Sequence, residues 1–106
     1  MAFPIGAGLL DAIVLAVVEE ESTYGYKITQ EVREVIELSE STLYPVLRRL
    51  LKEGCLCTFD KEFNGRNRRY YQLTPFGKVR LAQYRADWRE YCEKVSGVLL
   101  KEEQDK

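Results

Sequence analysis

The chain contains no histidine among its 106 residues. Histidine is the commonest metal ligand and the commonest general base in proteins, so its absence argues against a metal site and against catalysis. The chain also lacks a phosphate-binding glycine loop and a paired nucleophile and base, which other enzymes would require. We therefore expect a protein that is not an enzyme and that needs no metal or cofactor.

Long apolar segments are missing as well. No apolar run approaches the roughly 20 residues that span a bilayer, and the N-terminus lacks the basic flank and cleavage site of a signal peptide. Cysteine is scarce: Cys55, Cys57 and Cys92 leave an odd thiol, so we expect reduced cysteines, whose redox role stays open. These features predict a cytoplasmic protein of one domain's length with no membrane partner.

The net charge of −1 conceals a segregation of charge along the chain. Residues 1–40 hold two basic and eight acidic residues, a balance of −6, whereas residues 41–80 hold nine basic and three acidic residues, a balance of +6. Residues 81–106 hold five basic and six acidic residues, a balance of −1. Such a basic middle segment indicates a surface for a polyanion, although the charges could instead pair within the molecule on a solvated surface.

Apolar residues recur at helical spacing in three successive segments, at about 7–20, 26–36 and 41–54, with a turn at 22–25. In the third segment one arc of the helical wheel, about 140° wide, is apolar and should face the core. It consists of Leu43, Val46, Leu47, Leu50 and Leu51. The opposite arc carries Ser41, Tyr44, Arg48 and Lys52, with Thr42, Pro45 and Arg49 beside it.

The termini of this third helix also carry expected signals. Ser39 or Ser41 is a candidate N-cap and Gly54 a candidate C-cap. Pro45 should be tolerated because amides near a helix start lack intrahelical acceptors.

Two β-prone segments follow, at 55–63 and 68–73, separated by the hairpin signal Asn64-Gly65. Four cations surround the expected hairpin tip: Lys61, Arg66, Arg68 and Arg69. Arg68 and Arg69 alternate, so they cannot both face DNA on a regular strand. Aromatic packing against the helices is the favoured role for Tyr70 and Tyr71.

A helix followed by a basic hairpin is the plan of a winged helix, whose helix can enter a DNA major groove. We expect bases and phosphates in the major groove to meet the outward residues Ser41, Thr42, Tyr44, Arg48 and Lys52. The hairpin would meet the flanking backbone or minor groove through Arg66, Asn67 and Arg68.

The last helix is expected to open at Thr74-Pro75 and to carry a heptad repeat. Its interleaved positions are Leu81, Trp88 and Val95 with Tyr84, Tyr91 and Val98. Such a seam favours dimerisation, and the alternative is that this helix packs back on its own domain. The predicted fold is mostly α with a small β-hairpin (α+β): a winged helix-turn-helix domain in residues 1–74, then a C-terminal dimerisation helix and charged tail in residues 75–106.

Four segments together resemble the signature of PadR-type transcriptional regulators. They are YGY at 24–26, STLYPVLRRL at 41–50, EG at 53–54 and GRNRRYYQLTPFG at 65–77. The resemblance implies a homodimeric repressor that binds double-stranded DNA at a partly palindromic operator. A winged helix used only as a protein-interaction module is the alternative.

A single C-terminal helix is similar to the small, multidrug-sensing branch of that family. In that branch a tryptophan of the C-terminal helix pairs with its dimer mate around flat aromatic ligands. The resemblance therefore implies that Trp88 binds a planar aromatic effector, with Tyr84, Tyr91 and Asp11 as further walls; plain interface packing is the other role considered for Trp88. Acidic residues at Asp11 and at 19–21 would suit a cationic ligand.

Overall fold

Helix α1 (Ala7–Glu20) lies at the centre of the fold and packs against the other helices and the sheet. The computed structural model describes residues 7–101 of the chain. Leu10, Val14, Leu15 and Val18 of α1 are buried. Because α1 has neighbours on more than one side, its sequence is apolar on more than one side. No helix in this described part of the chain is both long enough and apolar enough to cross a bilayer.

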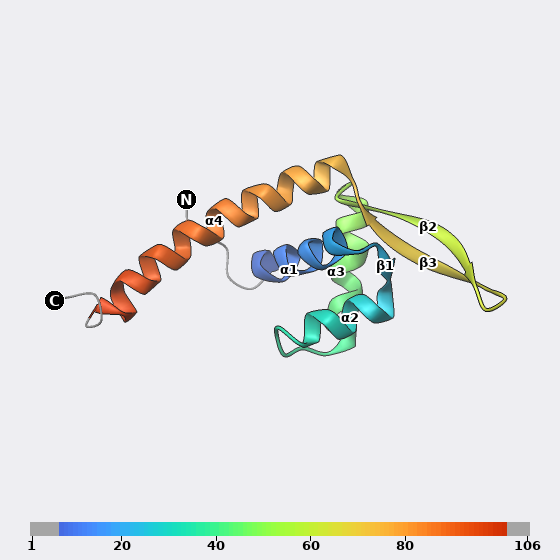
Figure 1. The fold of residues 1–106 in the computed structure, drawn as a ribbon, viewed down its shortest axis with the longest axis horizontal. Helices are drawn as coiled ribbons and strands as arrows, with labels where there is room; N and C mark the ends of the chain where they lie inside the picture. The colour runs from blue at the N-terminus through green and yellow to red at the C-terminus, as the bar shows by residue number, and fades with distance from the viewer. Residues whose placement is uncertain (1–6, 102–106) are drawn as a thin grey trace.

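Helices α2 (Gly25–Arg33) and α3 (Glu40–Lys52) form the helix-turn-helix; in Figure 1 α2 lies below α1, and α3 crosses α1. Helix α2 ends three residues before the predicted end at Ile36, so that prediction was wrong. Val35 is 68% exposed after the helix end, while Ile36 still packs against the core. The apolar spacing therefore continues into a turn, where Ile36 is partly buried although it is not helical.

Helix α3 follows the predicted wheel. Leu43, Leu47 and Leu50 are fully buried, and the partly buried Val46 and Leu51 pack against them.

Helix α3 ends in a Schellman motif. The amide of Gly54 donates to the carbonyl of Leu51 and the amide of Cys55 to that of Leu50. At the other end Ser39 is the N-cap residue, but its side chain makes no capping hydrogen bond. Pro45 lies in the second turn, so the reason given for its tolerance near the helix start does not apply.

Strands β2 (Leu56–Phe63) and β3 (Arg66–Leu73) form the hairpin, called the wing below, which projects from the helices in Figure 1. Asn64 and Gly65 join them with φ of 54° and 78°, the left-handed values of a tight hairpin turn. The predicted hairpin is confirmed, although β3 begins two residues earlier than expected.

A third strand, β1 (Thr23–Tyr24), pairs with β3 at Tyr71 and Tyr70, giving the sheet order β1-β3-β2. The sequence predicted only a turn at these positions. A strand of two residues is too short to show the alternation of apolar and polar residues by which strands are predicted. Strand β1 can therefore be identified only from its pairing with β3 in the structure.

Helix α4 (Pro75–Leu99) begins as predicted, with the Thr74 hydroxyl accepting a 2.9 Å hydrogen bond from the amide of Gly77. The same hydroxyl donates to the carbonyl of Gly54 at 2.6 Å, which ties the start of α4 to the end of α3. A Cβ at position 77 would overlap the Cys55 carbonyl oxygen, so this close approach requires glycine.

The helical core continues across the expected division at residue 74. Leu81 of α4 is only 1% exposed and belongs to the same cluster as the buried residues of α1 and α3. The first half of α4 therefore belongs to the same packed unit as α1, α2, α3 and the wing, called the winged unit below. The second half of α4 runs beyond the other helices (Figure 1). Val98 and Leu99 there are each 74% exposed.

The three cysteines are free thiols in different surroundings. Cys55 is buried and precedes β2, whereas Cys57 is exposed on that strand. Burial raises the pKa of the Cys55 thiol.

Candidate nucleic-acid interface and ligand groove

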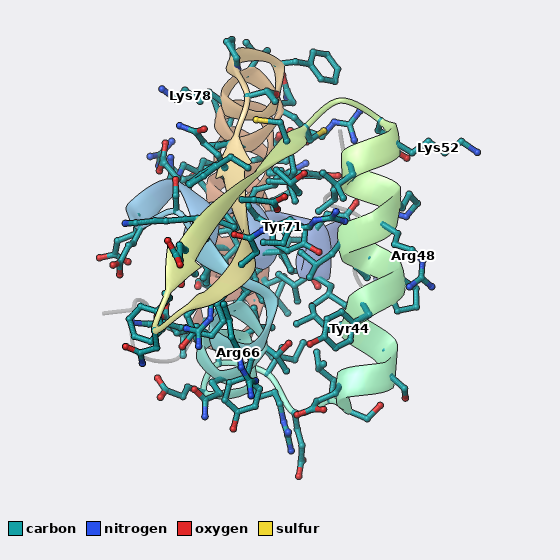
Figure 2. The ribbon with its side chains drawn as sticks, turned by 90° about the vertical axis from the view of Figure 1, so that its right-hand side faces the viewer. Tyr44, Arg48, Lys52, Arg66, Tyr71 and Lys78 are labelled. Carbon is teal, nitrogen blue, oxygen red and sulfur yellow. The ribbon has the colours of Figure 1, made fainter. Side chains whose placement is uncertain are left out.

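One side of α3 is exposed and polar along its whole length. Figure 2 shows Tyr44, Arg48 and Lys52 following one another along that side. Ser41 and Thr42 are exposed at its N-terminal end, where the Ser39 hydroxyl lies 3.0 Å from each of their hydroxyls. The helix thus presents hydroxyl groups first and cations later, the order expected of a helix that reads a major groove.

Tyr44 is less free than its neighbours on this face. It is 38% exposed, and its ring lies so close to Gly25 that a Cβ there would approach it to 3.2 Å. Tyr71 of the wing approaches the same glycine, and burial raises the pKa of the Tyr71 hydroxyl. The packing predicted for Tyr71 is therefore confirmed, and Gly25 gives room for both rings at the start of α2.

The wing has two chemically different faces because side chains alternate along β3. Tyr70 and Arg68 lie on one face, where Tyr70 stacks on Phe59 with ring centroids 5.5 Å apart. Tyr70 also meets Tyr24 edge-on, so it packs within the sheet and not on the helices, contrary to prediction. The Arg68 guanidinium lies 4.2 Å from the ring centroid of Tyr24 and 4.4 Å from that of Phe63.

The opposite face of the wing carries Asn67 and Arg69. The Arg69 guanidinium reaches Asp60 on β2 at 3.9 Å, at the limit of an ion pair. Asn67 therefore lies on the opposite face of the wing from Arg66 and Arg68, the residues predicted to contact DNA with it. Arg66 is exposed next to the turn, whereas Arg68 is partly buried.

A groove of about 600 Å³ separates α1 from α4. Its walls are mostly apolar: Leu9, Ile13 and Ala16 of α1, Val35 and Ile36 after α2, and Leu81, Tyr84 and Trp88 of α4. Its charged lining residues are Arg85 and Arg89. Among the predicted ligand residues, Trp88 and Tyr84 line this groove and Tyr91 does not, although the Tyr91 ring centroid is 6.0 Å from that of Trp88.

Asp11 does not line the groove, so its predicted place in the ligand wall is wrong. Its side chain is only 5% exposed and lies against α3, where Arg49 Nη1 donates to Oδ2 at 3.1 Å and Nη2 to Oδ1 at 2.5 Å. Donation to Asp11 raises the pKa of Arg49, despite the opposing effect of burial. With arginines lining the groove and Asp11 turned away, the lining gives no support to the cationic ligand suggested by the sequence.

A second ion pair adjoins the first. Arg80 of α4 donates to Glu53 at 2.5 Å, and Arg49 donates to the other oxygen of Glu53 at 3.4 Å. The pKa of Glu53 is lowered, chiefly by the hydrogen bond from Arg80. Arg49 thus connects α1, α3 and the start of α4. Nothing in the sequence signalled this role, because Arg49 and Asp11 are 38 positions apart.

Residues 14–83 match the family model described as the transcriptional regulator PadR-like family. This protein is a member of the PadR family. A transcriptional regulator of Mycobacterium tuberculosis is 35% identical over 79 residues, which cover 74% of each chain.

Solved structures agree with this assignment. A protein of Streptococcus mutans superposes with a TM-score of 0.84 at 37% identity, covering 93% of both chains. A PadR family transcription regulator of Clostridium difficile superposes with a TM-score of 0.76 at 32% identity, covering 88% of this chain and 99% of the other. The mostly helical winged helix-turn-helix is therefore the fold of a PadR transcriptional regulator.

The predicted seam of this PadR protein divides into two parts along α4. Leu81 is committed to the core of its own chain and has no surface left for a partner, so its predicted place in a dimer seam is wrong. Tyr84 is also partly buried against that core. Trp88 is 42% exposed and Val98 74% exposed, so the exposed part of the predicted seam begins near Trp88.

Proposed function

We propose that this PadR transcriptional regulator is a repressor without catalytic activity, which acts as a homodimer on a palindromic DNA operator. The observation that carries the proposal is the exposed polar side of α3, which runs from Ser41 to Lys52 beside a cationic wing. The family supplies the regulatory role, and this surface supplies a chemistry that suits DNA.

Helix α3, called the reading helix below, would make different kinds of contact with DNA along its length. Ser41, Thr42 and Tyr44 offer hydroxyl groups to base edges or phosphates, and Arg48 and Lys52 offer charge farther along the groove. The partial packing of Tyr44 against Gly25 restricts where its hydroxyl can reach. A restricted hydroxyl loses less conformational entropy when it binds than a free one does.

The wing would add phosphate contacts beside the reading helix. Arg66 is the wing cation best suited to this role, because it is exposed next to the turn. Arg68 lies against the rings of Tyr24 and Phe63, and because its side chain is only partly buried its guanidinium can still meet a phosphate. Asn67 would contribute only if DNA approached the other face of the hairpin.

Dimerisation would use the part of α4 that its own core leaves uncovered. That part carries Trp88, Tyr91, Val95 and Val98 at heptad spacing. A two-fold axis there would place two α3 helices on successive major-groove faces, roughly 34 Å apart.

The groove beside Trp88 would admit a planar aromatic effector that releases the repressor. Tyr84 and Trp88 supply aromatic surface for stacking. Arg85 of the lining is paired with Glu19 at 2.8 Å, so Arg89 is the lining charge that favours a neutral or anionic ligand. Release requires that the ligand bind more tightly to a form of the dimer with lower affinity for DNA.

Selection from random-sequence DNA followed by affinity measurements against salt concentration tests this function. We expect Arg48→Ala and Arg66→Ala each to reduce the salt slope by about one. Lys94→Ala, which removes the same charge from the exposed far part of α4, is the matched control. Failure to select any sequence, together with a heteromeric partner in pull-downs, would favour a protein-interaction module instead.

A further inference from the structure

Tyr84 contacts two different regions of the protein. Its ring lines the groove between α1 and α4, and its hydroxyl donates to Asp11 Oδ2 at 3.4 Å. Asp11 is the residue that Arg49 of the reading helix holds with two hydrogen bonds. The groove and the reading helix are thus joined through a single buried carboxylate.

The two hydrogen-bonding arrangements around Asp11 differ in strength. The Arg49 guanidinium binds both carboxylate oxygens, a charge-assisted geometry that is strong and directional. The bond from the Tyr84 hydroxyl is long for its type, since such bonds are commonest near 2.7–2.8 Å. An occupant of the groove would therefore break the Tyr84 bond far more readily than the Arg49 bond.

We propose that Tyr84, Asp11 and Arg49 form a relay through which an occupant of the groove alters the orientation of α3 and so its affinity for DNA. This inference rests on the proposed function. An occupant that turns the Tyr84 ring or binds its hydroxyl removes one donor from Asp11. The carboxylate, 5% exposed, then lacks one of its hydrogen bonds and moves with Arg49 to recover it.

The neighbouring ion pair determines what kind of movement follows. Arg80 holds Glu53 at the C-terminal end of α3 through a 2.5 Å hydrogen bond, and neither residue lines the groove. The C-terminal end of α3 therefore stays attached to α4 while Arg49, one turn earlier, shifts with Asp11 and gives up its weaker 3.4 Å hydrogen bond to Glu53. The expected response is a rotation of α3 about its C-terminal end, which displaces Tyr44 and Ser41 most.

Burial and the charge of Asp11 support this geometry, since both raise the pKa of the Tyr84 hydroxyl and keep its proton in place as a donor. Arg49 itself is partly buried and faces α1, while the adjacent Arg48 is exposed on the reading face. Because Arg48 and Arg49 are adjacent in α3, a movement of Arg49 also moves the backbone that carries the exposed Arg48.

The test uses the full-length protein, a DNA fragment that it selects from random sequence, and 8-anilinonaphthalene-1-sulfonate as the groove probe. This probe is aromatic and anionic, so it suits a groove lined by arginines and is repelled by DNA. Tyr84→Phe removes only the hydroxyl. Tyr26→Phe is the matched control, because Tyr26 is 53% exposed on α2 and its hydroxyl bonds only to Gln30 among the hydrogen bonds seen in residues 7–101.

We expect saturating probe to weaken DNA binding by the wild type and Tyr26→Phe, by roughly threefold to tenfold for the loss of one hydrogen bond. Tyr84→Phe should bind the probe with wild-type affinity. Its DNA affinity should already be weakened in the absence of the probe, and adding the probe should not weaken it further. Wild-type DNA affinity and a wild-type probe response in Tyr84→Phe would overturn the relay.

A measurement without DNA separates the relay from the proposed function. The ¹⁵N guanidinium resonance of Arg49, identified by its disappearance in Arg49→Lys, should shift in Tyr84→Phe. An unchanged resonance would contradict the relay even if the protein binds DNA. A shifted resonance in a protein that selects no DNA would support the relay and remove the repressor function.

Discussion

Arg49 of α3 holds both carboxylate oxygens of Asp11, a residue of α1 that lies 38 positions earlier in the chain. This pair joins α3, the helix proposed to read DNA, to the central helix α1. Asp11 is buried among apolar residues of α1, so its charge depends on Arg49 for compensation.

Arg49→Met should lower the free energy of unfolding by about 2–3 kcal/mol, because it leaves the Asp11 carboxylate buried without its cation. The loss falls below the roughly 3–5 kcal/mol usual for a fully buried pair because the Arg49 side chain is 40% exposed. Arg48→Met, one residue away on the exposed face, should change stability by less than about 0.5 kcal/mol. Urea denaturation measures both, and similar losses in the two variants would refute the special role of Arg49.

Combining Arg49→Met with Asp11→Leu should restore much of that stability, because replacement of both members of a buried ion pair is far less costly than loss of one. The double-mutant cycle should yield a coupling energy above about 1 kcal/mol. Additive losses would mean that the two residues act independently.

Gly77→Ala should destabilise the fold strongly, by about 3 kcal/mol or more, because the new methyl group would overlap the Cys55 carbonyl oxygen. Gly97→Ala is the matched control on the same helix, since a Cβ added there would have no neighbour within 4 Å among the described residues. That control should stabilise α4 by about 0.5–1 kcal/mol through helix propensity. Thermal unfolding followed by circular dichroism distinguishes the two signs.

The Glu53–Arg80 pair predicts how stability changes in acid. Because the pKa of folded Glu53 lies below its ordinary value near 4.5, its contribution is complete above that pH and is lost as the pH falls through the lowered value. The difference in Tm between wild type and Glu53→Gln should therefore be present near neutral pH and disappear in acid. Glu37→Gln, which removes the same charge at an exposed loop position, is the matched control.

Val98→Glu should dissociate the proposed dimer, because a charge would replace an apolar seam residue. Val79→Glu is matched to it: Val79 is 67% exposed on the same helix but lies outside the heptad positions. Sedimentation at micromolar concentration should give a monomer only for Val98→Glu. A dimer in both variants would place the interface elsewhere.

Helix α3 and the wing could be predicted because their patterns are local. Leu43, Leu47 and Leu50 recur with the period of a helix, and Asn64-Gly65 specifies a tight turn by its backbone preferences. Both signals depend on neighbours in the sequence, which is why the structure reproduces them.

Features that depend on distant partners could not be predicted in this way. From the sequence alone, Asp11 would be placed on the solvent-exposed side of its helix. Only the structure shows that it is buried and paired with Arg49. Similarly, a seven-residue period shows that Leu81 needs an apolar neighbour, but not whether that neighbour belongs to the same chain. Leu81 packs in the core of its own chain, whereas later positions of the same heptad pattern are exposed. One periodic pattern therefore covers both a core contact and an exposed surface.

The unbroken course of α4 has a mechanical consequence. Leu81 fixes one part of this helix in the winged unit, and Val98 lies 17 residues farther along the same helix. That separation is roughly 26 Å at 1.5 Å per residue, so α4 acts as a rigid lever arm. In the proposed dimer, a change of about 10° in how two such helices cross would displace each winged unit by roughly 4–5 Å, enough to take two reading helices out of register with successive turns of DNA.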